Sequence, residues 1–153
     1  MDHFFSKSII TLRSNVDKEL YPNNNIYNFS NQLCDNLSFS NKTKVALCEI
    51  HLPLNFRFIL EQSKYREIFV LSDIVEESIV GSLRLNILKV ITINNDKFPT
   101  NCQVELFSNL LFYDLKFSEL NSINFQITDS WGSALRTDNE TKFDETFTVL
   151  KFK

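Results

Sequence analysis

The segment EIFVLSDIVEESIVGSLRLNILKVITI (67–93) contains two apolar runs separated by an acidic connector. The first run, EIFVLS (67–72), is almost continuously apolar, which is typical of a strand covered on both faces. The second run, LRLNILKVITI (83–93), is rich in Leu, Ile and Val, and its first alternate positions are apolar. The segment therefore predicts two β-strands joined by a short connection.

The acidic connector carries Asp73, Glu76 and Glu77, and it ends at Gly81, one of only two glycines in the chain. The spacing Asp73-x-x-Glu76 is that of a helix capping box, and glycine is favoured at the left-handed residue that ends a helix. Adjacent glutamates point in different directions on a helix or a strand, which argues against a paired-carboxylate active site. We therefore predict a capped helical turn in which Asp73 accepts backbone amides and neither glutamate is catalytic.

Six further segments have the period-2 or short apolar pattern of strands. They are SIITLRS (8–14), NIYNFSNQL (25–33), KVALCEIHL (44–52), QVELFS (103–108), INFQIT (123–128) and FTVLKFK (147–153). Pro22 lies in the turn signal YPNNN (21–25), and Pro53 follows the third of these strands. The segment 55–67 fits either a short helix or an irregular crossover. We expect one all-β domain over residues 1–153, an eight-stranded jelly-roll sandwich with short helical connections.

The composition limits the classes of function open to the chain. Its 153 residues carry a net charge of −3, and its basic residues are scattered instead of forming the patch that phosphate binding needs. No apolar run approaches the roughly 20 residues of a membrane-spanning helix. We therefore expect no direct nucleic-acid contact and no membrane span. The heavy use of Asn and Lys is consistent with an AT-rich genome.

Residue types that often carry chemistry are few. The cysteines have no CxxC spacing, and neither histidine has a second histidine at metal-ligand spacing. These residues are Cys34, Cys48, Cys102, His3 and His51. Cys48 and His51 are three residues apart, which on a strand places them on opposite faces. No phosphate-binding, dinucleotide-binding or nucleophile-elbow motif is present. We expect a non-enzymatic protein with no catalytic residues, no metal site and no cofactor.

A long polar segment, DSWGSALRTDNETKFDE (129–145), contains the single tryptophan of the chain. Trp131 stands beside Gly132, which fits either a turn with an anchoring aromatic residue or a contact residue on the surface. We take Trp131 and Arg136 as the candidate contact residues of this loop.

Three blocks of the sequence, in the same order along the chain, resemble the minor capsid (penton) proteins of Polinton/Maverick elements and adintoviruses. The first block is residues 4–56, with the turn YPN at 21–23 and LCEI at 47–50 followed by Pro53. The second is residues 69–91, with DIVE at 73–76 and a later Val-Gly. The third is residues 120–153, with INFQITDSWG at 123–132. The chain departs from the family pattern at Glu77, where the family often has proline, at Ser82, where the family has an acid, and at Cys48, where the family has a small residue. The family's second glycine is also missing near 139–142.

The resemblance implies a single jelly roll that assembles as a homopentamer and fills the five-fold vertices of an icosahedral capsid. It would sit among trimers of a double-jelly-roll major capsid protein. The location implied is the virion, for a protein made in the cytoplasm or nucleus of a host cell, with a host receptor that the resemblance does not identify. The motif residues Asp73, Glu76, Gly81, Pro22 and Pro53 would then be structural.

Other interpretations remain open. A glycan- or receptor-binding β-sandwich module could use Trp131 with Tyr113 or Phe112 as an aromatic platform. A cellular domain descended from the capsid protein would keep the same fold with another task. An enzyme built on a β-sandwich is the third alternative, and no constellation of residues in the sequence points to it.

Overall fold

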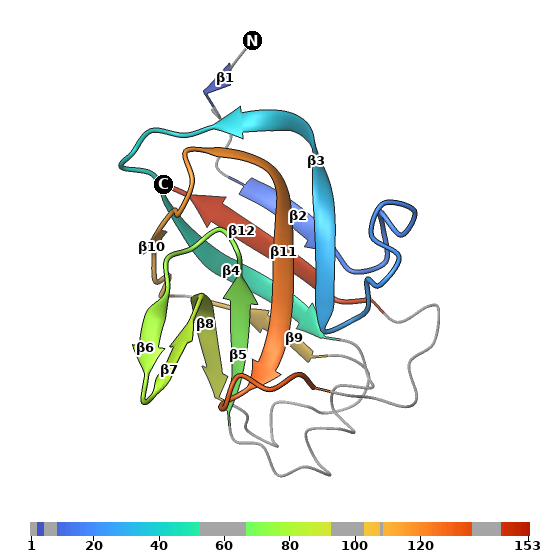
Figure 1. Ribbon diagram of the computed structural model, residues 1–153, viewed down its shortest axis with the longest axis vertical. Helices are drawn as coiled ribbons and strands as arrows, with labels where there is room; N and C mark the ends of the chain where they lie inside the picture. Colours follow the sequence, from blue (N-terminus) through green and yellow to red (C-terminus); the bar gives the residue numbers. More distant parts are fainter. Residues whose placement is uncertain (1–2, 5–8, 53–66, 93–102, 108, 136–144) are drawn as a thin grey trace.

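The computed structural model describes residues 3–4, 9–52, 67–92, 103–107, 109–135 and 145–153 (Figure 1). Every regular element in these ranges is a β-strand, and none is a helix. The strands are β1 (His3–Phe4), β2 (Ile9–Arg13), β3 (Asn28–Ser38), β4 (Lys44–Leu52), β5 (Glu67–Ser72), β6 (Ser78–Val80), β7 (Leu83–Leu85), β8 (Ile87–Thr92), β9 (Gln103–Leu106), β10 (Tyr113–Asp114), β11 (Glu119–Asp129) and β12 (Phe147–Phe152). The all-β class predicted from the sequence is confirmed.

The strands form two main sheets that face one another as a sandwich (Figure 1). One sheet has the order β1-β3-β11-β5-β8. The other has the order β10-β4-β12-β2, and β9 also pairs with β4. Strands β6 and β7 form a separate two-stranded hairpin. Strands β2 and β3 therefore lie toward one lateral edge of the sandwich, while β8 and the β6–β7 hairpin lie at the other.

The strand pairing is nested along the chain. Strand β2 pairs with β12, β3 with β11, β4 with β9 and β5 with β8, and all four pairs are antiparallel. Two more antiparallel pairs, β12 with β4 and β11 with β5, join these pairs into the two sheets. The chain is thus arranged as one long hairpin of strands rolled up on itself, and most partners are distant in sequence.

The core lies between the two sheets. Strand β11 contributes Ile123 and Phe125, which have no exposed surface. Phe29 on β3 stacks against Phe125 with ring centroids 5.8 Å apart, and Phe39 stacks against Phe152 at 5.0 Å. Burial of one such side chain stabilises the fold by about 1.5–3 kcal/mol. Four of the 15 phenylalanines thus stack in two pairs in the core.

The predicted capped helical turn after β5 is wrong, because this part of the chain forms a β-hairpin. Asp73 lies in a turn directly after β5, and β6 pairs with β7 around the two-residue loop Gly81-Ser82. Gly81 has a φ of +60°, which a type II′ loop requires at its first position and which suits the twist of a hairpin. The β-branched Ile79 and Val80 also favour a strand over a helix.

The strand boundaries follow the sequence prediction where the apolar runs are continuous. Strands β4 and β5 match the predicted segments 44–52 and 67–72 residue for residue. Strands β3 and β11 each extend to 11 residues, well beyond the predicted segments. The residues by which these strands exceed the prediction are mostly polar, and only one face of the strand is covered there. A search for apolar runs therefore does not predict them as strand.

The predicted strand 83–93 is divided in two at Asn86. The Asn86 side chain donates a hydrogen bond through Nδ2 to the carbonyl oxygen of Val75 at 2.9 Å, which ties the hairpin to the turn before it. Pro53 and nearly all of the predicted helix or crossover 55–67 lie outside the described residues. The expected short helical connections therefore have no counterpart in the described part of the chain.

Asparagine side chains hold the edge of β2 to β3. Asn31 Oδ1 accepts the N–H of Arg13 at 2.8 Å, and Asn31 Nδ2 donates to the carbonyl oxygen of Arg13 at 2.8 Å. Asn24 acts in the same way on the loop before β3, because it donates to the carbonyl oxygens of Val16 and Ser30 and accepts the N–H of Ser30. Both asparagines are buried, and each side chain takes the place of a neighbouring strand.

Replacing Asn31 with alanine is expected to lower the free energy of unfolding by about 1–3 kcal/mol, because the N–H and C=O of Arg13 both lose their partners. Urea unfolding followed by circular dichroism measures the change. Asn36→Ala, at an exposed position of the same strand, is the matched control and should change stability by less than about 0.5 kcal/mol. Equal stability of the two variants would contradict the role assigned to Asn31.

Candidate functional site

The acidic connector contributes one side chain, Asp73, to an interaction across the sheet. Asp73 Oδ1 accepts the backbone N–H of Asn124 on β11 at 2.9 Å. Glu76 and Glu77 are exposed. Among the described residues, no group of three His, Cys, Asp or Glu side chains lies close enough to hold a metal ion. The three carboxylates of the connector therefore do not converge on a common site.

Asn124 is the centre of a hydrogen-bond network that joins three strands. Its Nδ2 donates to Asn28 Oδ1 at 3.1 Å, to the carbonyl oxygen of Phe29 at 3.2 Å and to Ser30 Oγ at 2.9 Å, all on β3. The backbone carbonyl oxygen of Asn124 accepts a hydrogen bond from the hydroxyl of Ser72 on β5 at 2.8 Å. Together with Asp73, this network fixes the β3, β11 and β5 strands in register, which is a structural task.

Partial burial raises the pKa of the Asp73 carboxyl above its ordinary value of 3.8, because the ionised form loses some of its water, although the residue as a whole is exposed. The hydrogen bond from Asn124 and the charge of Lys116 lower the same pKa, but burial has the larger effect. The folded protein therefore holds this proton more tightly than the unfolded chain does. The contribution of Asp73 to stability falls as the pH rises through the range just above 3.8.

The turn after β11 holds Trp131 in a fixed position. Asp129 is buried, and its Oδ1 accepts the N–H groups of Trp131 and Ser133, both at 2.9 Å. The Gly132 N–H donates to the carbonyl oxygen of Asp129 at 3.1 Å. The side chain of Trp131 is nevertheless 77% exposed. A well-ordered turn thus presents a large aromatic ring to solvent, which is typical of a contact residue. From the sequence, Trp131 was selected but Asp129 was not. An aspartate two residues before Trp131 is the spacing of an Asx turn, and this spacing could have identified it.

The Trp131 turn packs against the β6–β7 hairpin. Gly132 has a φ of +78°, and a Cβ atom at this position would lie 3.2 Å from Leu85 Cδ2 on β7. A side chain here would be both strained and crowded. The glycine therefore allows the turn and the hairpin to lie in contact at the same side of the molecule.

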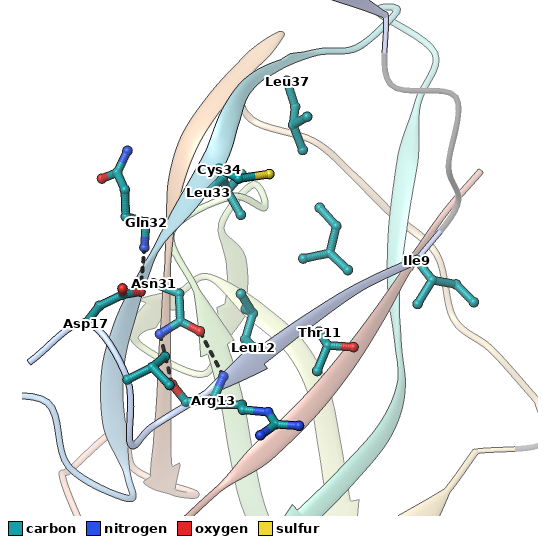
Figure 2. A pocket seen from close by; sticks show the side chains of 12 residues that line it. Ile9, Thr11, Leu12, Arg13, Asp17, Asn31, Gln32, Leu33, Cys34 and Leu37 are labelled. Carbon is teal, nitrogen blue, oxygen red and sulfur yellow. Dashed lines mark hydrogen bonds between the residues drawn. The ribbon is translucent and has the colours of Figure 1, made fainter.

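A groove of about 400 Å³ runs between β2 and β3 (Figure 2). Its lining is mainly apolar and includes Ile9, Ile10, Leu12, Leu33 and Leu37. Polar side chains of Arg13, Asp17 and Gln32 also line it. The sequence did not reveal this groove, because its walls belong to two strands that lie in different sheets and do not pair with each other.

Cys48 and His51 have separate partners. The Cys48 thiol donates a hydrogen bond to the carbonyl oxygen of Val149 at 3.2 Å, and burial raises the pKa of this thiol. His51 Nε2 contacts the carboxylate of Glu49, and its ring meets the edge of Phe147 with centroids 5.1 Å apart. A protonated thiol bonded to a backbone carbonyl is a poor nucleophile, so this pair offers no thiol chemistry.

The remaining predicted residues are dispersed. Pro22 is exposed in the turn before β3, far along the chain from the Asp73 connector. Pro53 and Arg136 lie outside the described residues. Sequence reasoning missed Asn24, Asn31 and Asn124, because asparagine is so frequent in this chain that no single one stands out.

No protein-family model matches the chain, and a search of curated proteins finds no match. Among the described residues there is no helix long and apolar enough to cross a membrane. The strand pairing and the exposed side chains are therefore the observations from which a function is inferred.

The two substitutions Asp73→Ala and Asp73→Asn are expected to differ in stability. Alanine removes the acceptor for the Asn124 N–H and should lower the free energy of unfolding at neutral pH by about 1 kcal/mol. Asparagine keeps an acceptor oxygen and removes the carboxyl charge that burial penalises, so its stability should equal or exceed that of the wild type. Thermal unfolding at several pH values measures both effects.

The pH dependence isolates the contribution of Asp73. The stability of the wild type relative to Asp73→Asn should fall as the pH rises through the range just above 3.8. A relative stability that instead rises through this range would show that the folded-state pKa is lowered, contrary to the cause given above.

Replacing Asp129 with alanine should loosen the turn that carries Trp131, because two N–H groups lose their common acceptor. Trp131 is the single tryptophan of the chain, so its fluorescence anisotropy decay reports the motion of this turn directly. We expect a larger amplitude of nanosecond motion and a loss of about 1–3 kcal/mol in stability. Asp35→Ala, at an exposed position on β3, is the control. Unchanged anisotropy in Asp129→Ala would contradict this account of the turn.

Proposed function

We propose that the protein is a structural capsid protein, a penton subunit that forms homopentamers at the five-fold vertices of an icosahedral shell. The observation that carries this proposal is the nested antiparallel pairing of β2, β3, β4 and β5 with β12, β11, β9 and β8. Pairing the first strand with the last, and so on inward, supports a jelly roll, the double-sheet fold used by viral capsid proteins and by lectin domains.

The blocks that resemble penton proteins fall on these paired strands. The block 4–56 contains β2, β3 and β4, the block 69–91 contains most of β5 and β8, and the block 120–153 contains nearly all of β11 and all of β12. The partners of β2 and β3 lie in the last block, and β5 and β8 pair within the middle block, whereas β9, the nested partner of β4, lies outside all three blocks. This agreement between the resemblance and the pairing supports a common fold.

Exposed apolar side chains support a role in assembly. A closed ring of identical subunits needs two different surfaces on each subunit. Ile9, Val16 and Leu20 are exposed on or just after β2, whereas Ile79 and Val90 are exposed on the opposite side of the sandwich, on β6 and β8 (Figure 1). In the proposed shell the ring is surrounded by the double-jelly-roll major capsid protein, within a virion assembled in a host cell.

A second function, binding of a glycan or a receptor protein, is favoured by one observation. Trp131 is held by the buried Asp129 and exposes 77% of its side chain. An exposed aromatic ring on a backbone held in this way can stack on a sugar or fill a pocket on a partner. This function is compatible with a vertex protein, or it stands by itself if the protein is a free binding module.

The mass of the purified protein tests the capsid proposal. Light scattering is expected to give about five times 17.9 kDa, and negative-stain images should show rings. A protein that stays monomeric at all concentrations, both by itself and when co-expressed with a double-jelly-roll major capsid protein, would contradict the proposal. Glycan binding by such a monomer, abolished by Trp131→Ala, would support the free binding module instead.

A further inference from the structure

The β6–β7 hairpin presents one apolar side chain between two charges. Ile79 on β6 is 75% exposed, and Arg84, its cross-strand partner on β7, is also exposed. Directly opposite residues of an antiparallel pair lie on the same face. Glu77 is exposed and lies two residues before Ile79, so in an extended chain it shares that face. The hairpin therefore offers an isoleucine flanked by an acid and a base.

The edge of β2 above the groove has backbone groups available for another chain. Asn31 binds both the N–H and the C=O of Arg13, so at this residue these groups point away from β12 (Figure 2). Backbone groups alternate in direction along a strand, so those of Thr11 and Ile9 also point away from β12. In the described part of the chain, β12 is the sole strand that pairs with β2. The groove thus combines an apolar lining with an unpaired strand edge.

The charges around the groove complement those of the hairpin. Arg13 and Asp17 both line the groove. The Arg13 side chain is 55% exposed; it contacts Glu145 at 3.7 Å and its guanidinium lies 5.1 Å from the centroid of the Phe147 ring. Asp17 accepts the N–H of Gln32 at 3.0 Å through one carboxylate oxygen. An incoming hairpin that places Glu77 near Arg13 and Arg84 near Asp17 pairs opposite charges on both sides of Ile79. Such pairing adds little affinity at a surface, but it selects one orientation of the partner.

The hairpin and the groove lie on opposite sides of the molecule. Figure 1 shows β6 and β7 at the lower left, while β2 crosses the upper middle of the view and the long arm of β3 lies to the right of β11. One molecule cannot join its own two surfaces, so the contact has to form between copies. A contact between two different surfaces is heterologous, and its repetition closes a ring when the rotation between copies permits.

We propose that Ile79 on the hairpin of one copy enters the β2–β3 groove of a second copy, with the strand edge of β2 and the two charge pairs fixing its orientation. The inference rests on the proposed capsid function, because that function supplies the partner whose hairpin enters the groove, a second copy of this chain. It goes beyond that function because it assigns the two surfaces that meet.

A disulfide tests this contact directly, because the exposed Cys34 lines the groove. In the variant Ile79→Cys, mild oxidation should link the introduced thiol to Cys34 of a neighbouring copy, and peptide mass spectrometry identifies the linked residues. The double variant Ile79→Cys with Cys34→Ala should lose this link. Leu111→Cys is the matched control, since Leu111 is also apolar and exposed but belongs to neither proposed surface, and it should form no link to Cys34.

Disruption of the contact gives a second readout. Ile79→Asp should weaken self-association at least about tenfold by light scattering, as expected for a central contact residue, with unchanged thermal stability of the monomer. Cys34→Arg, which places a charge in the groove, should act alike. A mixture of the two variants has one intact hairpin and one intact groove, so it should form 1:1 dimers that neither variant forms by itself.

The outcomes separate this inference from the proposed function. Rings that form normally but show neither the Cys34 link nor any effect of Ile79→Asp would overturn the inference and leave the penton proposal standing. A link from Ile79→Cys to a cysteine of the major capsid protein, and not to Cys34, would also overturn it. A wild type that never associates, with or without the major capsid protein, rejects both.

Discussion

The whole structure depends on the antiparallel pairing of the last strand, β12, with both β2 and β4. Strand β12 lies inside its sheet, so without it β2 has no partner and one wall of the core is missing. Buried side chains of Leu150 and Phe152 face the core from this strand. Its start is fastened by a reciprocal pair of hydrogen bonds between Ser14 and Thr146, each donating its backbone N–H to the other residue. Strand β12 thus joins the C-terminal part of the chain to β2 near its start, a pairing between segments that are far apart in sequence and that raises the contact order.

Polar side chains replace many of the backbone contacts that a sandwich leaves open at its edges and connections. Asn31 satisfies the outer backbone groups of Arg13 on β2, Asn24 those of the loop before β3, and Asn124 adds side-chain hydrogen bonds across the β3–β11 pair. Asparagine suits this task because its amide both donates and accepts, as a peptide group does. The asparagines that are so frequent in this sequence thus include residues with specific structural contacts. Glycine is needed at Gly81 and Gly132, where φ is positive.

The surfaces that this framework leaves exposed are consistent with a protein that works through contacts. The hairpin with Ile79 and the turn with Trp131 are neighbours through the Gly132–Leu85 contact, and they lie across the sandwich from the β2–β3 groove. Two unlike surfaces on opposite sides favour head-to-tail association over a symmetric dimer. The exposed ring of Trp131, by contrast, is a feature of a surface that binds a ligand. The capsid and the binding proposals therefore draw on different parts of one surface, which is why they can be tested separately.

The sequence by itself determined the all-β class and the position of the core strands, because a run such as KVALCEIHL (44–52) is apolar on both faces wherever it is placed. It also singled out Trp131 and Asp73. It misread the connector after β5, since the spacing Asp73-x-x-Glu76 is a local signal that a helix and a turn before a hairpin share. Only the tertiary structure decided the partner of Asp73, which is Asn124, 51 residues away, and the groove whose walls come from two sheets. The reason is physical: local patterns report which face of a segment is apolar, whereas hydrogen bonds between distant strands exist only once the sheets have assembled.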